Sequence, residues 1–125
     1  QKYKNTKANL DNNSLVLKLT YGAHSFLFTG NIKAEACRDL TKLGSKIQST
    51  VLQIPSNGGG SIDVPTFYQR VAPKNSVAQT GPKGAVANEI QTLLKSQGSV
   101  VLLTSEKGAV QISTDGIALN VKTEK

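Results

Sequence analysis

The chain has 125 residues, of which 38% are hydrophobic and 18% are charged. This length suffices for one folded domain with a real core, and the composition excludes a disordered chain. No apolar run approaches the roughly 20 residues that cross a bilayer, and the polar start Gln1–Lys4 is no signal peptide. Fifteen Lys and Arg against eight Asp and Glu give a net charge of +7, which favours anionic partners.

The positive charges are scattered, and only two of them are arginines. A solvated basic surface is therefore the simpler interpretation, with DNA or another anion as the expected partner. The single cysteine, Cys37, excludes an internal disulfide and is expected to be a small buried residue of a helix. The only histidine, His24, falls in a predicted hairpin turn, away from any thiol partner.

The first twelve residues are polar and lack periodicity, which predicts a tail ahead of a domain over residues 13–125. Two alternating apolar runs, Leu15–Thr20 and Ser25–Thr29, predict strands of a hairpin with the four-residue link Tyr21–His24. A helical stripe follows over Lys33–Leu43, and Thr50–Ile54 reads as a short strand.

The second half of the chain continues the alternation of helices and strands. The pattern predicts helices at Val64–Val71 and Ala85–Gln97, and strands at Asn75–Gln79, Val100–Leu103, Ala109–Ser113 and Ile117–Val121. This order of elements predicts an α/β fold, with a mixed β-sheet and helices packed on one face.

Two segments carry a resemblance to a known family. Residues 12–31 read NNSLVLKLTYG…FLFTGN, and VLQIPSNGGGS follows about 20 residues later. Together with TSEKGAV at 104–110 and Thr114–Gly116, this order resembles the C-terminal half of a metallo-β-lactamase-fold domain. The nearest variety is that of competence-type DNA-uptake channel proteins (ComEC-like). The resemblance implies half of an αββα sandwich, and a soluble extracytoplasmic domain of a bacterial membrane protein.

The chain departs from the family where the family binds metal. Asn31 stands where the family has a bridging Asp, and Ser56 and Asn57 begin the segment that aligns with its HHGS. A neutral amide cannot supply a bridging carboxylate. The resemblance therefore implies no metal, no cofactor and no catalytic residue, but a degenerate active-site rim of Asn31, Ser56, Asn57, Gly58, Gly59, Gly60 and Ser61.

The expected function is a non-catalytic scaffold or binding module of a DNA-uptake protein, and the chain is not expected to be an enzyme. The alternative is a metal-dependent hydrolase completed by a separate N-terminal half. Asn31 could equally be a left-handed turn residue. The glycine triplet at 58–60 could be a loose loop or an anion-binding nest. Nothing in the spacing supports a catalytic triad of His24, a serine and Asp63.

A lone half of a two-sheet sandwich would expose one apolar sheet face, and such patches usually mark interfaces. A homodimer, or pairing with the missing N-terminal half, follows as an expectation. The candidates for the core or for that face are Leu15, Leu17, Leu19, Phe26 and Phe28.

Overall fold

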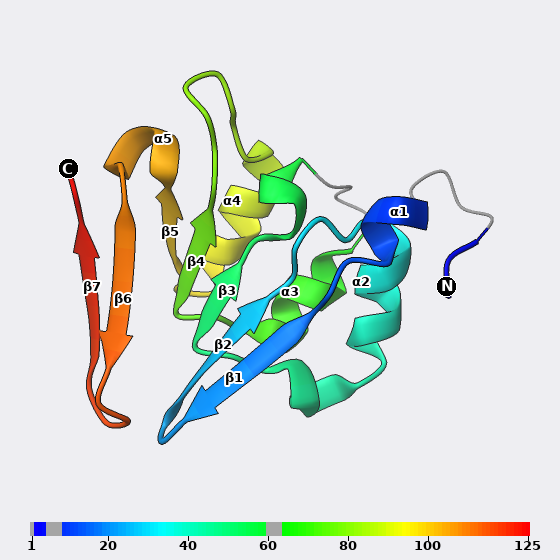
Figure 1. Ribbon diagram of the computed structural model, residues 1–125, viewed down its shortest axis with the longest axis horizontal. Helices are drawn as coiled ribbons and strands as arrows, with labels where there is room; N and C mark the ends of the chain where they lie inside the picture. The colour runs from blue at the N-terminus through cyan, green and yellow to red at the C-terminus, as the bar shows by residue number, and fades with distance from the viewer. Residues whose placement is uncertain (1, 5–8, 60–63) are drawn as a thin grey trace.

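A five-stranded mixed sheet organises the domain (Figure 1). The structure is a computed structural model, and it describes residues 2–4, 9–59 and 64–125. Its strand order is β1-β2-β3-β4-β5. The first two strands are antiparallel, and the remaining neighbours are parallel. The strands are β1 (Leu17–Tyr21), β2 (His24–Phe28), β3 (Val51–Gln53), β4 (Asn75–Ala78) and β5 (Val100–Leu103).

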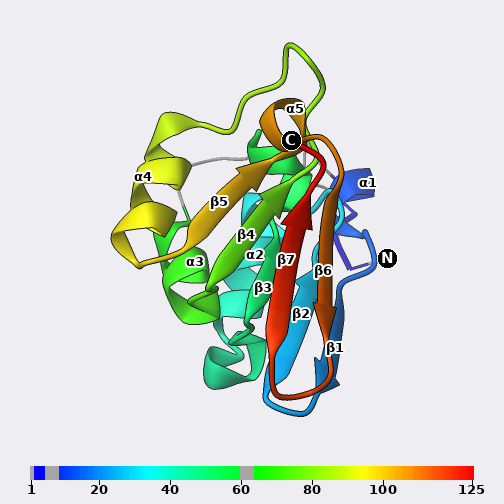
Figure 2. The ribbon, with the colours of Figure 1, turned by 90° about the vertical axis from the view of Figure 1, so that its left-hand side faces the viewer.

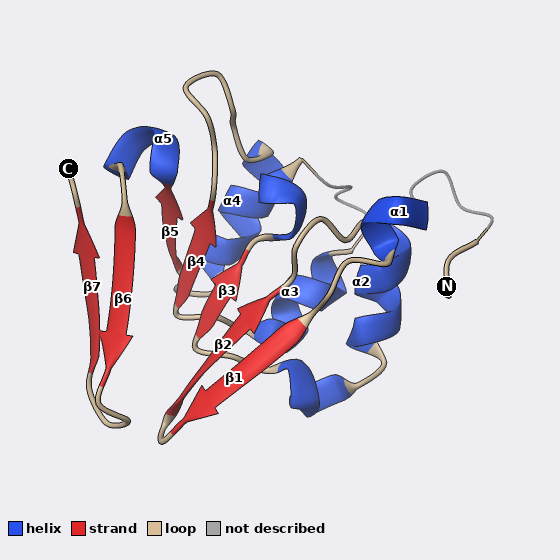
Figure 3. Ribbon diagram, viewed as in Figure 1, coloured by secondary structure: helices blue, strands red, loops and turns tan. Residues whose placement is uncertain are grey.

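The two faces of this sheet are covered differently (Figures 1 and 2). Helices pack on one face, whereas a separate hairpin of β6 (Val110–Thr114) and β7 (Leu119–Thr123) lies over the other. Figure 3 shows this division, with most helices on one side of the strands and the hairpin on the other, while the short α5 connects β5 to the hairpin. The helical segments are α1 (Asn9–Asn12), α2 (Ala34–Thr41), η1 (Gly44–Ile47), η2 (Pro55–Gly58), α3 (Pro65–Val71), α4 (Asn88–Ser96) and α5 (Thr104–Lys107).

The hydrophobic core lies between the sheet and the helices. Leu27 and Leu52 contribute from the strands, and Phe67, Ile90 and Leu94 from the helices. The core is mainly aliphatic, because the chain has three Phe, three Tyr and no Trp. Cys37 is buried there as expected, and burial raises the pKa of its thiol to about 12. The predicted α/β class, with a mixed sheet and helices, is confirmed.

The first hairpin is tighter than the sequence predicts. Tyr21 and His24 face each other as the last strand pair, so the link is the two residues Gly22 and Ala23 and not four. Gly22 has φ +57°, a conformation that a two-residue hairpin turn requires and that glycine adopts easily. The final hairpin is also shifted, because each of its strands begins one or two residues later than predicted.

The end of the predicted polar tail is ordered and packed. Residues 9–12 form the single turn α1, and Asn12 is only 3% exposed. Its Oδ1 accepts hydrogen bonds from the backbone N–H groups of Lys33 (2.8 Å) and Ala36 (3.4 Å). Its amide donates to Glu35 Oε2 at 2.8 Å. This part of the tail therefore caps α2, which has no capping side chain next to it in the sequence.

No helix within the described ranges 2–4, 9–59 and 64–125 has the length and apolar character to cross a bilayer.

Candidate functional site

The predicted rim lies at the carboxyl ends of β2 and β3, the edge where α/β folds usually carry their sites. Asn31 follows β2 and is exposed, whereas Ser56 and Asn57 belong to η2 after β3. The structure brings the two segments together, since Ser56 Oγ donates to the carbonyls of Asn31 (2.9 Å) and Ile32 (3.0 Å). The Ser56 backbone N–H also donates to Gly30 O at 3.1 Å.

The left-handed residues of the rim are not those that the sequence indicates. Asn31 does not adopt a positive φ, because the preceding Gly30 takes that role with φ +56°. Ser56 (φ +50°) and Asn57 (φ +54°) are left-handed instead. Non-glycine residues are strained in this conformation, and such strain persists where surrounding contacts fix the backbone. The turn after β3 is thus held by its hydrogen bonds to the turn after β2.

The glycine segment is only partly described. Gly58 is buried, with φ +79°, and a Cβ at this position would lie 2.6 Å from Val86 Cγ1. This glycine is therefore required by packing. Gly59 is exposed, while Gly60 and Ser61 lie outside the described residues, as does Asp63.

One contributor to the rim is missed by the sequence analysis. The side-chain oxygen of Gln53 accepts hydrogen bonds from the backbone N–H groups of Thr29 (3.0 Å) and Gly30 (3.2 Å). Thr29 Oγ1 in turn donates to Gln53 O at 2.7 Å. The only signal in the sequence is a single polar residue inside the apolar strand VLQI. These bonds fix the loop that carries Asn31.

The rim does not fit the metal pair that the resembled family holds at the aligned positions. Asn31 offers a neutral amide, and the Ser56 hydroxyl is already bonded to two backbone carbonyls. Across the described part of the chain, no three His, Cys, Asp or Glu side chains gather closely enough to hold a metal ion. His24 lies at the opposite edge of the sheet, where its Nε2 donates to Ile117 O at 2.7 Å.

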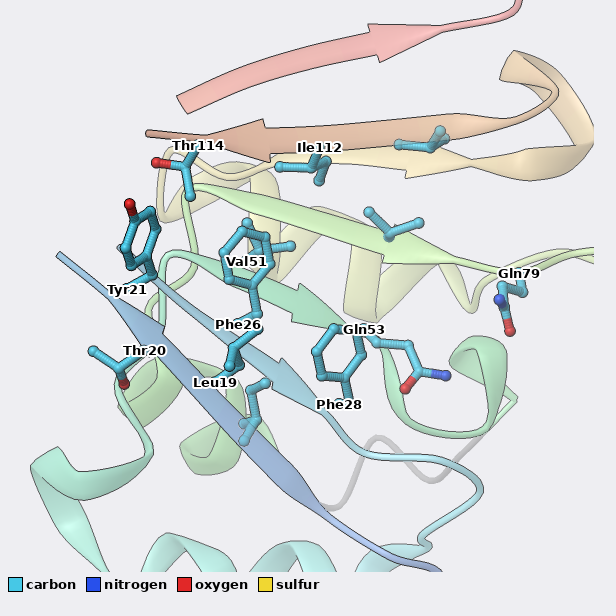
Figure 4. Close-up of a pocket in the computed structure, with 13 residues that line it drawn as sticks. Leu19, Thr20, Tyr21, Phe26, Phe28, Val51, Gln53, Gln79, Ile112 and Thr114 are labelled. Atoms are coloured by element: carbon cyan, nitrogen blue, oxygen red, sulfur yellow. The ribbon is translucent and has the colours of Figure 1, made fainter. Parts of the chain in front are cut away.

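A larger site lies on the face of the sheet that the helices do not cover (Figure 4). A cavity of about 700 Å³ opens between this face and β6. Its walls are mostly apolar, and the sparse polar groups include Gln53, Gln79 and Thr114. The cavity is lined by Leu19, Thr20, Tyr21, Phe26, Leu27, Phe28, Val51, Gln53, Val77, Gln79, Val110, Ile112 and Thr114.

This face remains exposed around the cavity. Leu17 is 52% exposed, Leu19 53%, Tyr21 56% and Phe28 44%. All four side chains project from β1 and β2 toward the hairpin side, because Leu17 pairs with Phe28 and Leu19 with Phe26. The two phenylalanines stack with ring centroids 6.5 Å apart. The sequence predicts that these apolar residues lie either in the core or on an open sheet face. In the structure most of them lie on the open face. Leu15, just before β1, is 81% exposed.

Comparison with known proteins gives two distant relatives. No protein-family model and no solved structure matches the chain. ComE operon protein 3 of Bacillus subtilis (strain 168) is 25% identical over 107 residues, which are 83% of this chain and 14% of that protein. Uncharacterized protein YcaI of Escherichia coli (strain K12) is 29% identical over 113 residues, 87% of this chain and 15% of that protein. The chain thus spans a small part of the length of these relatives.

Proposed function

We propose that this chain is a non-catalytic, metallo-β-lactamase-like half domain that acts as a scaffold and binding module in a longer DNA-uptake protein. The sequence motifs and the similarity to ComE operon protein 3 support the kinship. The proposed parent is a bacterial membrane protein that holds this domain outside the bilayer, on the extracytoplasmic side. Contact with DNA through the basic surface is the proposed second role of the module.

The open apolar face of the sheet is the observation that carries this proposal. Four large side chains of β1 and β2 are between 44% and 56% exposed, beside a cavity of about 700 Å³. Contiguous apolar patches of this kind mark interaction sites. The hairpin β6–β7 covers part of the face, and an isolated two-stranded hairpin is only marginally stable in water. The second layer is therefore incomplete in this chain.

The proposed occupant is a β-strand from the rest of the longer polypeptide, paired with the free edge of β6. Among the described strands β6 pairs only with β7, which leaves its other edge open. In Figure 2 that edge lies on the side of β1 and β2. An added strand would lay alternate apolar side chains on the exposed face and keep polar ones outside. It would continue the pattern of β6, where Val110 and Ile112 are half-buried and Gln111 is exposed.

The length of the relatives favours this occupant over a second copy of the chain. Each relative matches the chain over only 14% or 15% of its own length, so a polypeptide of that type has ample sequence to supply the strand. A strand from the same polypeptide also binds at a high effective concentration. Its binding avoids the loss of translational and rotational freedom that accompanies dimer formation.

Metal analysis of the longer polypeptide, purified without chelator, tests the non-catalytic part of the proposal. We expect no stoichiometric metal, because the rim lacks carboxylate and imidazole ligands at Asn31, Ser56 and Asn57. About two ions per chain, the content of a two-metal hydrolase site, would contradict it. The variant Asn31→Ala is the matched check, since metal bound elsewhere in the polypeptide would be unaffected by this change.

Light scattering on the isolated 125-residue chain tests the occupant. The proposal predicts a monomer that converts to a stable complex when the preceding segment of the parent is added in trans. A stable dimer of the isolated chain, lost on changing Phe28→Asp, would instead assign the face to a second copy.

A further inference from the structure

A polar hollow lies at the amino-terminal edge of the sheet, opposite the rim. It measures about 340 Å³ and is formed where β1, β2, η1 and the α3–β4 connection meet. Serine and threonine hydroxyls line it together with lysine side chains, and none of its lining residues is acidic. The lining residues are Lys18, Ala23, His24, Ser25, Ser45, Gln48, Ser49, Thr50, Ala72 and Lys74.

Two exposed lysines, Lys18 and Lys74, line this hollow. Lys18 Nζ donates to Lys46 O at 2.9 Å, which holds its ammonium group over η1 at the mouth. Within the described ranges, neither of these two lysines forms an ion pair. By contrast, Lys2 and Lys42 both form ion pairs with Asp39. The positive charge at the hollow is therefore available to an external anion.

We propose that this hollow binds the phosphate backbone of a nucleic acid. Lysines and hydroxyls are among the side chains that contact phosphate oxygens, and the hollow offers Lys18, Lys74 and the hydroxyls of Ser45 and Thr50 without a competing carboxylate. The hydroxyls of Ser25 and Ser49 already donate to Gln48 O and Ile47 O. No Phe, Tyr or Trp lines it, and its one aromatic ring, that of His24, is held by a hydrogen bond to Ile117 O. The hollow therefore offers no free aromatic platform for a base, and binding is expected to be independent of sequence. The inference gives a location to the DNA contact in the proposed function, and it does not depend on the docking of a strand at β6.

The test compares two double variants that remove the same charge. The first, Lys18→Gln with Lys74→Gln, removes the positive charge of both lysines that line the hollow. Lys83→Gln with Lys122→Gln removes two exposed lysines that do not line it. Binding of a fluorescent single-stranded oligonucleotide is followed by anisotropy between about 50 and 200 mM salt. Circular dichroism melting confirms that each variant is folded.

The hollow variant is expected to bind at least about tenfold more weakly, with the slope of log affinity against log salt reduced by about one for each lost contact. The control variant is expected to keep most of its affinity. Equal losses in both variants would overturn the location and leave DNA contact by net charge alone. No binding by the unmodified chain at the lowest salt would overturn both this inference and the DNA role proposed above.

Discussion

The backbone N–H of Ala23 donates a 2.7 Å hydrogen bond to Gly116 O and so joins the tips of the two hairpins. His24 Nε2 adds a second bond, to Ile117 O. The β6–β7 hairpin is thereby attached at its turn to the β1–β2 turn, and at its start it continues from α5 after β5. This double attachment holds the hairpin over the apolar face and leaves the edge of β6 free.

Replacing Gly22 by alanine should loosen this attachment. A Cβ at Gly22 would collide with the backbone of Gly116, and Gly22 also has φ +57°. Gly98→Ala is the matched control, because Gly98 has φ +82° but nothing within 4 Å of its Cβ position. We expect Gly98→Ala to cost about 1 kcal/mol of unfolding free energy, and Gly22→Ala to cost clearly more. Urea unfolding measures both, and equal losses would show that the contact contributes nothing.

Asn12→Ala should destabilise the domain by about 1–2 kcal/mol, because it leaves the buried N–H groups at the start of α2 without their acceptor. The exposed Asn120, on β7, provides the control. Its change to alanine is expected to alter the unfolding free energy by no more than about 0.5 kcal/mol. If Asn12→Ala were as mild as Asn120→Ala, residues 9–12 would not be a structural cap.

Acid should weaken the domain in part through Asp39. Hydrogen bonds from Lys42, then from the Tyr3 hydroxyl (2.7 Å) and from Lys2, hold the pKa of this carboxyl well below its usual range. The folded state therefore binds the Asp39 proton less readily than the unfolded state. The resulting stability is full above about pH 4 and is lost as the pH falls below it.

Asp39→Asn is accordingly expected to reduce the dependence of unfolding free energy on pH below about pH 4. Glu89→Gln, an equal change of charge at an exposed position of α4, provides the comparison. Urea titrations at pH 7 and in acid separate the two variants. An identical acid response in Asp39→Asn and in the unchanged chain would refute the role of this carboxyl.

The rim offers a test by compensation. Gly58→Ala places a methyl group against Val86, which is only 1% exposed, and should destabilise the domain. Val86→Ala alone leaves a cavity in the core and should also be destabilising. Combined, the smaller residue at position 86 makes room for the new methyl group. The double variant should therefore lose less stability than the two single losses together. If the two losses of unfolding free energy simply added, the backbone strain at φ +79°, and not the contact with Val86, would decide the effect of Gly58→Ala.

The sequence predicts the elements of the fold well because most of them have strong local patterns. Alternating apolar residues identify β1 and β2, and glycine or proline marks many of the element ends. Boundaries differ where tertiary contacts decide them. Helix α4 begins at Asn88 and not at Ala85, because Val86 is used to fill the space beside Gly58. The cap by Asn12 joins residues 21 positions apart, so no local pattern reveals it.

The candidate sites are predictable only in part. Asn31 and Ser56 lie together at one edge of the sheet because each follows one of two neighbouring parallel strands, a placement that the motif spacing indicates. The role of Gln53 depends on side-chain geometry across the strands, which no spacing shows. The polar hollow brings together Lys18 and Lys74 from two separate segments, and in the sequence these residues look scattered.

Hydrogen exchange at β6 tests the central claim, that a strand from the longer polypeptide covers the apolar face. The backbone N–H groups of Val110–Thr114 are compared between the isolated chain and the longer polypeptide, with those of β7 as an internal reference. The account predicts that β6 amides exchange much more slowly in the longer polypeptide, because an added strand bonds the free edge. Equal exchange of β6 in both would contradict the claim.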